Sequence, residues 1–131
     1  MRKLLTFFMS LVVAMGIGLV AAPAASATTA GCGELTNGLL CLDKLTPRES
    51  GDYRVQYDRY SGSGALSVKM GIQHKSEGYN PKAFTWLGTD TVSAGGSVWS
   101  DKRYYTITDG DCLRGGMVAG GKSFVTKWRC F

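Results

Sequence analysis

The stretch of sequence that decides the fold is "YRVQYDRYSGSGALSVKMGI", from Tyr53 to Ile72. Its first part places Tyr53, Val55 and Tyr57 at every second position, with polar residues between them. Its last part alternates in the same way, with the apolar members Leu66, Val68, Met70 and Ile72. Because side chains of a β-strand point alternately to two faces, each part predicts a strand with one buried face. The glycine-containing link "SGSG" at 61–64 predicts that the two strands form a β-hairpin.

Further strand-like segments follow this stretch. They are "AFTWLGTDTV" (83–92), "VWSDKRYYTI" (98–107), "CLRGGMVAGGK" (112–122) and "SFVTKWRCF" (123–131). Glycine clusters separate them, and the pair Gly120-Gly121 predicts a two-residue hairpin turn. We find no convincing helical periodicity after residue 27. The sequence therefore predicts an all-β fold, a single small antiparallel sandwich or barrel of about seven strands.

The N-terminus has the pattern of a secretory signal peptide. Arg2 and Lys3 precede an uncharged run over 4–20, and the small residues "AAPAASA" (21–27) end in a cleavage-type site. We expect cleavage after Ala27, with Ala24 as the lesser option and an uncleaved membrane anchor as the alternative. We expect a single mature domain over 28–131. Removal of Arg2 and Lys3 lowers the net charge from +5 to +3, which is no nucleic-acid footprint by itself. The expected localisation is secreted and extracellular, with no stable membrane anchoring.

Four cysteines remain in the predicted mature chain. They are Cys32, Cys41, Cys112 and Cys130. An even number of cysteines in a short exported chain predicts disulfide bonds. Zinc sites need tight cysteine pairs or histidines at ligand spacing, and the sequence has neither. Redox pairs need C-x-x-C, which is also absent. The local pairing Cys32–Cys41 with Cys112–Cys130 is favoured, and Cys32–Cys130 with Cys41–Cys112 remains the alternative.

Candidates for catalysis are few. His74 is the only histidine, it lies in a predicted loop over 74–82, and no nucleophile-elbow motif accompanies it. A small secreted ribonuclease could use His74 with Lys75 and Glu77, and a glycosidase could use two of the ten acidic residues. We predict no catalytic residue, no metal ligand and no cofactor.

Aromatic residues supply both a core and a candidate binding surface. The residues expected to fill the core are Tyr53, Tyr57, Trp86, Phe124 and Trp128. Others break the alternating pattern or lie beside polar segments, and Tyr and Trp next to cations make good binding anchors. The candidate binding surface consists of Tyr79, Lys82, Trp99, Lys102, Arg103 and Tyr104.

Four segments carry resemblances to known secreted proteins. The signal segment, "CGELTNGLLCL" (32–42) and the 53–72 stretch resemble small secreted actinobacterial proteins of the Streptomyces type, many of which have no assigned function. Over 32–42 alone, C-x8-C followed by Leu42 also resembles the start of secreted crystallin-like metalloproteinase inhibitors, but "DKLTPRESG" replaces their aromatic-rich continuation. The ending "KWRCF" (127–131) is similar to that of secreted α-amylase inhibitors, whose tryptophan-arginine-tyrosine triplet is absent. The resemblances imply a small, rigid inhibitor or binder and assign no functional residue.

The expected function is therefore non-catalytic binding, as an inhibitor of an extracellular hydrolase or as an antimicrobial-type factor. The loop over 74–82, with Tyr79 as its anchor, is the expected reactive segment, because loops carry function on rigid scaffolds. The alternatives are a cell-envelope- or spore-associated structural protein and a small secreted hydrolase. The expected partner is an extracellular protein or a cell-wall component, and no nucleic acid.

Overall fold

The computed structural model describes residues 31–131, and the predicted signal peptide at 1–27 lies outside the described residues. Over this range the chain forms ten β-strands, and it contains no helix that could span a membrane. The strands are β1 (Cys32–Leu35), β2 (Gly38–Lys44), β3 (Gly51–Arg59), β4 (Leu66–Lys75), β5 (Thr85–Val92), β6 (Ser97–Trp99), β7 (Arg103–Tyr105), β8 (Cys112–Ala119), β9 (Lys122–Val125) and β10 (Arg129–Cys130).

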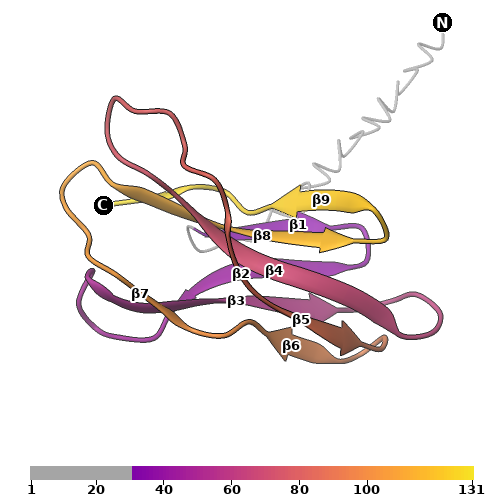
Figure 1. Ribbon diagram of the computed structural model, residues 1–131. Coiled ribbons are helices and arrows are strands. Elements are labelled where there is room, and N and C mark those ends of the chain that lie inside the picture. Colours follow the sequence, from indigo (N-terminus) through magenta and orange to yellow (C-terminus); the bar gives the residue numbers. More distant parts are fainter. Residues whose placement is uncertain (1–30) are drawn as a thin grey trace, which may run out of the picture.

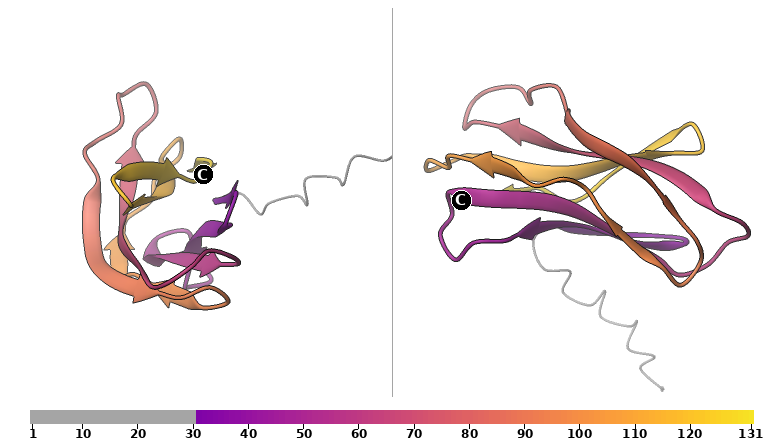
Figure 2. Two further views of the ribbon diagram at one scale, coloured as in Figure 1. Left: turned by 90° about the vertical axis from the view of Figure 1, so that its right-hand side faces the viewer. Right: turned by 60° about the horizontal axis from the view of Figure 1, so that its bottom comes forward.

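The strands form two antiparallel sheets of five strands each (Figure 1). In sheet A the order is β1-β2-β3-β6, and β7 also pairs with β3. In sheet B the order is β10-β8-β4-β5, and β9 also pairs with β8. The two views in Figure 2 show the sheets as two layers, one over the other. The all-β prediction is confirmed, but the strands number ten rather than about seven.

The strand count differs for two reasons. β1 and β2 form a hairpin where the sequence predicted only a disulfide, and two predicted single strands are divided. The segment 98–107 becomes β6 and β7, since Ser100 turns inward between them. Its hydroxyl accepts a hydrogen bond of 2.9 Å from the N–H of Val55. The C-terminal segment likewise divides into β9 and β10. The turn at Gly120-Gly121 is confirmed, because Ala119 pairs with Lys122 across it and both glycines have positive φ angles.

The predicted hairpin over 53–72 is wrong in its pairing and right in its strands. β3 buries every second residue, and β4 alternates through Val68, Met70 and Ile72. The two strands nevertheless belong to different sheets, since β3 pairs with β2, β6 and β7 while β4 pairs with β5 and β8. The link over 60–65 therefore crosses from one sheet to the other. Two strands with matching apolar faces can either lie side by side or face each other across a core, and the alternation is the same in both cases.

Apolar side chains from both sheets form one core. Sheet A contributes Leu40, Leu42, Tyr53, Val55, Tyr57 and Val98, and sheet B contributes Val68, Met70, Ile72, Val92, Leu113, Met117 and Ala119. Tyr53 and Tyr57 are buried as predicted, and Phe124 packs at the edge of the core. The prediction of core positions for Trp86 and Trp128 is wrong. Trp86 is 39% exposed, Trp128 is half-buried, and neither belongs to the core.

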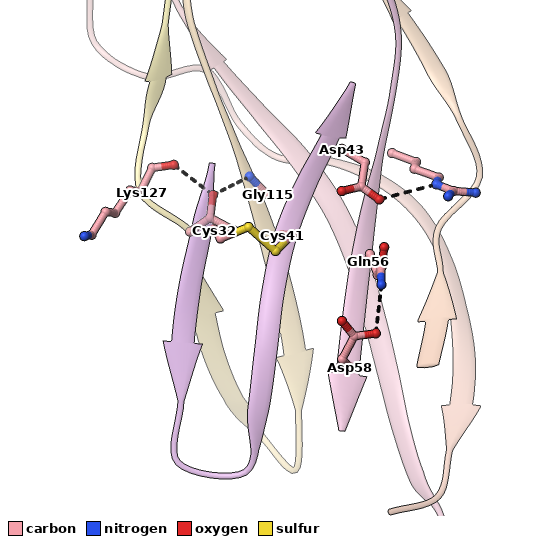
Figure 3. The surroundings of a disulfide bond; sticks show 9 residues. Cys32, Cys41, Asp43, Gln56, Asp58, Gly115 and Lys127 are labelled. Carbon is pink, nitrogen blue, oxygen red and sulfur yellow. Dashed lines mark hydrogen bonds and ion pairs between the residues drawn. A yellow bond between two sulfur atoms is a disulfide. The ribbon is translucent and has the colours of Figure 1, made fainter. Parts of the chain in front are cut away.

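Two disulfides join neighbouring strands. The structure links Cys32 to Cys41 and Cys112 to Cys130, which is the favoured pairing, and no cysteine is free among the described residues. Each bridge joins residues that are directly opposite in an antiparallel pair. Figure 3 shows the first bridge across β1 and β2, with Gly115 of β8 and Lys127 beside it. Each bridge therefore holds one of the two ends of the described chain onto its sheet.

Candidate binding site at one end of the sheets

The connection over 76–84, between β4 and β5, protrudes beyond both sheets at one end of the molecule (Figure 1). Two hydrogen bonds close its base. The N–H of Lys82 donates to the carbonyl of His74 at 2.9 Å, and Nε2 of Gln73 donates to the carbonyl of Lys82 at 2.7 Å. Within the loop, the N–H of Tyr79 donates to the carbonyl of Ser76 at 3.1 Å. These hydrogen bonds restrain the base of the loop and one turn within it.

Tyr79 stands at the exposed part of this loop. Its side chain is 78% exposed, more than any other large hydrophobic residue in the described chain. Tyr79 and Lys82 line a shallow hollow together with Ser76 and Asn80. An exposed tyrosine beside a cation on a closed loop has the form of a binding anchor.

A small pocket lies between the base of this loop and β7. Its volume is about 270 Å³, and the lining residues are His74, Lys82, Ala83, Thr85, Arg103, Tyr104, Tyr105 and Thr106. Three members of the predicted surface, Lys82, Arg103 and Tyr104, therefore gather here from segments twenty residues apart in the chain. We call the loop over 76–84 together with this pocket the loop end.

The other two predicted members are placed differently. Lys102 extends away to an ion pair with Asp52, whose Oδ2 lies 3.2 Å from its Nζ. Trp99 is on β6, opposite Gln56, with the Arg54 guanidinium 5.4 Å from its ring centre. It does not line the pocket. The structure therefore divides the predicted surface, and Trp99 belongs to the outer face of sheet A.

His74 lies at the inner side of the pocket and not in a loop, because β4 continues through His74 and Lys75. Its side chain is 17% exposed, so the expectation of an exposed loop histidine is wrong. Nε2 lies 3.1 Å from Oδ1 of Asp111, so the imidazole is in direct contact with this carboxylate.

Asp111 is buried behind His74. Both the N–H and the hydroxyl of Thr108 donate to its Oδ2, each at 2.9 Å. The backbone N–H of Thr108 is the main cause that holds the pKa of Asp111 well below its usual range. Burial opposes this effect, while the hydroxyls of Thr108 and Ser76 and the imidazole of His74 add to it. Asp111 is thus a fixed negative charge at the back of the site.

Tyr105 forms another wall of the pocket. Its ring centre lies 6.2 Å from those of His74 and Tyr53, and the Arg103 guanidinium lies 5.9 Å from it. Burial raises the pKa of Tyr105, and Thr85 and Arg103 partly oppose this rise. The buried hydroxyl has no partner in hydrogen-bond geometry, although Thr85 is near enough to affect its pKa. As expected for consecutive tyrosines, Tyr104 is exposed while Tyr105 is half-buried.

The three residues considered for a ribonuclease site, His74, Lys75 and Glu77, do not form one site. His74 lies on the inner side of β4, next to Asp111. Lys75, the next residue on the strand, lies on the opposite face, with its Nζ 4.8 Å from the ring centre of Trp128. Glu77 packs against Gly110, where an added Cβ would collide with its side chain. Strand alternation therefore separates the two cationic candidates.

Sequence reasoning missed Asp111 and Tyr105 as parts of this site. The only local signal is the spacing Thr108-x-x-Asp111 in a turn, which favours a carboxylate that binds a nearby N–H. Nothing local shows that the turn lies beside His74, because that depends on the pairing of β8 with β4, in which Lys75 is opposite Cys112. Among residues 31–131, no three side chains of His, Cys, Asp or Glu gather in the manner of a metal site.

No family model, no curated protein and no solved structure matches this chain.

Replacement of Asp111 by asparagine tests the role of this buried charge. A carboxylate whose pKa is lowered by folding stabilises the native state above its unfolded pKa, and this stabilisation is lost as the pH falls through the folded value. We expect Asp111→Asn to lower the free energy of unfolding at pH 7 by about 2 kcal/mol, as for a broken charge-assisted hydrogen bond. Urea denaturation between pH 2 and 8 should also show a smaller loss of stability below about pH 4 in the variant than in the native protein.

The matched control is Asp109→Asn, an exposed carboxylate in the same turn. Its stability should stay within about 0.5 kcal/mol of the native value at every pH, as is usual for surface substitutions. An unchanged acid slope in Asp111→Asn would contradict the assignment.

Proposed function

We propose that this protein is an exported, non-catalytic binding protein, processed near Ala27, that inhibits an extracellular hydrolase through the loop end. The observation that carries the proposal is the loop over 76–84, which is closed at its base by two hydrogen bonds and presents Tyr79 with 78% exposure. An inhibitor gains affinity when the inserted segment is already ordered.

The surroundings of the loop support a partner with an acidic surface. Lys82 and Arg103 line the pocket at its base and take part in none of the ion pairs found among residues 31–131. The two cations are therefore free to pair with carboxylates of a partner, and the apolar ring of Tyr79 supplies the buried contact area. Such a combination of one aromatic anchor with neighbouring charges is typical of binding hot spots.

The experiment is a titration of the mature protein against secreted proteases and amylases. We expect stoichiometric loss of activity of one such enzyme, and we expect Tyr79→Ala to weaken this inhibition by about 30-fold or more, as for an interface hot spot. The melting temperature of Tyr79→Ala should equal that of the native protein, because the side chain is exposed.

Tyr60→Ala is the matched control, since Tyr60 is 64% exposed in the link between β3 and β4 and lies outside the loop end. It should inhibit as well as the native protein. If both variants lose inhibition equally, or if Tyr79→Ala melts many degrees lower, the loop end is not the binding surface.

A further inference from the structure

The outer face of sheet B carries a strip of aromatic rings. Gly71 of β4 pairs with Gly116 of β8, and both lack a side chain on this face. An added Cβ on Gly71 would lie 2.8 Å from the Trp86 ring, and one on Gly116 would collide with the ring of Phe84. The two rings stack on each other with centres 5.2 Å apart. The paired glycines therefore make a flat site on which Phe84 and Trp86 lie, and this explains why Trp86 is outside the core.

Three cations lie against the rings of Trp86 and Trp128. Nζ of Lys69 is 4.9 Å from the ring centre of Trp86. Nζ of Lys75 and the guanidinium of Arg114 lie 4.8 and 4.3 Å from that of Trp128. Nε of Arg114 also donates to the side chain of Gln73 at 2.8 Å. We call Lys69, Lys75, Phe84, Trp86, Arg114 and Trp128 the basic aromatic strip.

The strip has no acidic counterpart. β4, β8, β9 and β10 contain no Asp or Glu, and the one acidic residue of β5, Asp90, is opposite the buried Val68 and so lies on the other face of the sheet. The ion pairs found in the described part of the chain do not include Lys69, Lys75 or Arg114. The outer face of sheet A differs from this strip because basic side chains there form ion pairs with acidic ones. Figure 3 shows the ion pair of Asp43 and the hydrogen bond from Gln56 to Asp58 on that sheet. Lys69, Lys75 and Arg114 thus lie on one face of sheet B without an ion-pair partner among the described residues.

The length of the strip indicates the size of its ligand. Lys69 and Lys75 lie six positions apart on one strand, which corresponds to about 20 Å at 3.3 Å per residue. Arg114 lies opposite Gln73, between them. A single phosphate or carboxylate cannot reach all three cations, whereas a chain with repeated anionic groups can.

We propose that the basic aromatic strip binds a linear polymer with phosphodiester groups between polyol or sugar units, of the kind found in bacterial cell envelopes. Each cation contacts one phosphate, and the edges of the aromatic rings contact the apolar surface of the repeating units. The cations approach the polymer without breaking ion pairs, since they have none. The strip is separate from the loop end, so this binding does not depend on the inhibition proposed above.

The rings themselves distinguish this ligand from a single-stranded nucleic acid. Proteins that bind single strands stack bases on free aromatic faces. Here Trp86 is covered by Lys69 and Phe84, and Trp128 has Lys75 and Arg114 against it. The strip therefore offers phosphate contacts and no free stacking platform.

The test is calorimetric titration of the mature protein with poly(glycerol phosphate), and with a single-stranded DNA oligonucleotide of equal charge. We expect binding of the first polymer to weaken with salt, with log K falling by about 2 to 3 per tenfold salt increase if three phosphates are contacted. The triple variant Lys69→Gln, Lys75→Gln, Arg114→Gln should bind at least about 30-fold more weakly at 50 mM salt, and Lys75→Gln alone should lower the salt slope by about 1.

The control variant Lys44→Gln, Arg48→Gln, Arg54→Gln removes the same charge from the part of the chain that forms sheet A. It should bind within about threefold of the native protein, since it keeps the strip intact. Equal loss in the two triple variants, absence of binding by the native protein, or tighter binding of the DNA oligonucleotide would each overturn the proposal. The single variant Lys75→Gln keeps the test decisive if the triple variant does not fold.

Discussion

Replacement of Arg59 by methionine is expected to lower the free energy of unfolding by about 3 kcal/mol, because it leaves the buried carbonyl of Val92 and three partly buried carbonyls without their donor. Arg59 ends β3 and is only 6% exposed. Its guanidinium donates to the carbonyls of Gly64 at 2.7 Å and Val92 at 2.8 Å, and to those of Ser61 and Ser63 at 3.2 and 3.3 Å. It is therefore the donor that ties the link over 60–65 and β5 to the end of β3.

The position of Arg59 explains why this effect should be large. Val92 belongs to sheet B and Arg59 to sheet A, so one side chain connects the two sheets where the chain crosses between them. A methionine fills similar volume but donates nothing, and a lysine offers its donors at a single point rather than in a planar fork. Arg59→Lys should consequently recover only part of the stability.

Arg54→Met is the matched control for this prediction. Arg54 lies on the outer face of the same strand, with its Nε 3.6 Å from Oδ2 of Asp43 and its side chain 35% exposed. Surface ion pairs of this kind contribute little, and we expect a change within about 1 kcal/mol. Urea denaturation of the three variants gives the comparison. Equal losses in Arg59→Met and Arg54→Met would show that the buried hydrogen bonds are not responsible.

Removal of the Cys112–Cys130 bridge is expected to cost about 3 kcal/mol, and the melting temperature should fall by roughly 10–20 °C. The bridge closes a loop with a sequence separation of 18. It also holds the C-terminal residue, since the N–H of Phe131 donates to the carbonyl of Asp111 at 3.0 Å and the Phe131 ring lies 6.2 Å from that of Tyr53. Without the bridge, the two-residue strand β10 keeps only its backbone hydrogen bonds and the packing of the neighbouring Phe131.

The double variant Cys112→Ala, Cys130→Ala should be compared with Cys32→Ala, Cys41→Ala. The second bridge spans a separation of 9 within a β-hairpin, so the entropy argument predicts a slightly smaller loss, by roughly 0.5 kcal/mol. Calorimetry gives the melting temperatures, and hydrogen exchange at Gly110 and Phe131 should accelerate only in the first variant. A shift of less than about 3 °C in the first variant would contradict a stabilising role for that bridge.

Local pattern was sufficient for β3, β4, β5 and β8, but it was insufficient for the strands that pair with them. The alternation of Tyr53, Val55 and Tyr57 predicted a strand buried on one face, and β3 is that strand. The same alternation in β4 was taken as the second half of a hairpin, yet β4 lies in the other sheet. Period-two alternation reports only which side chains face the core, and it is identical for strands that pair and for strands that face each other.

In the candidate site, too, local features were predictable and contacts between distant strands were not. The exposure of Tyr79 and the gathering of Lys82, Arg103 and Tyr104 were predicted from polar surroundings. The position of Asp111 in the site was not predicted, because its place behind His74 follows from the pairing of β8 with β4. Trp86 and Trp128 were placed in the core on their apolar character, but Gly71 and Gly116 provide a flat outer surface that takes aromatic rings equally well.

The sequence by itself determined that this chain is built from short strands with one buried face, and it favoured local pairing of its cysteines. These properties depend on neighbouring residues, since alternation and short loop closure act over a few positions of the chain. Only the tertiary structure decided that β3 and β4 oppose each other across the core, that His74 meets Asp111, and that the uncompensated cations share one face. Those contacts join residues distant in sequence, and their energies depend on which strands pair, which no local pattern encodes.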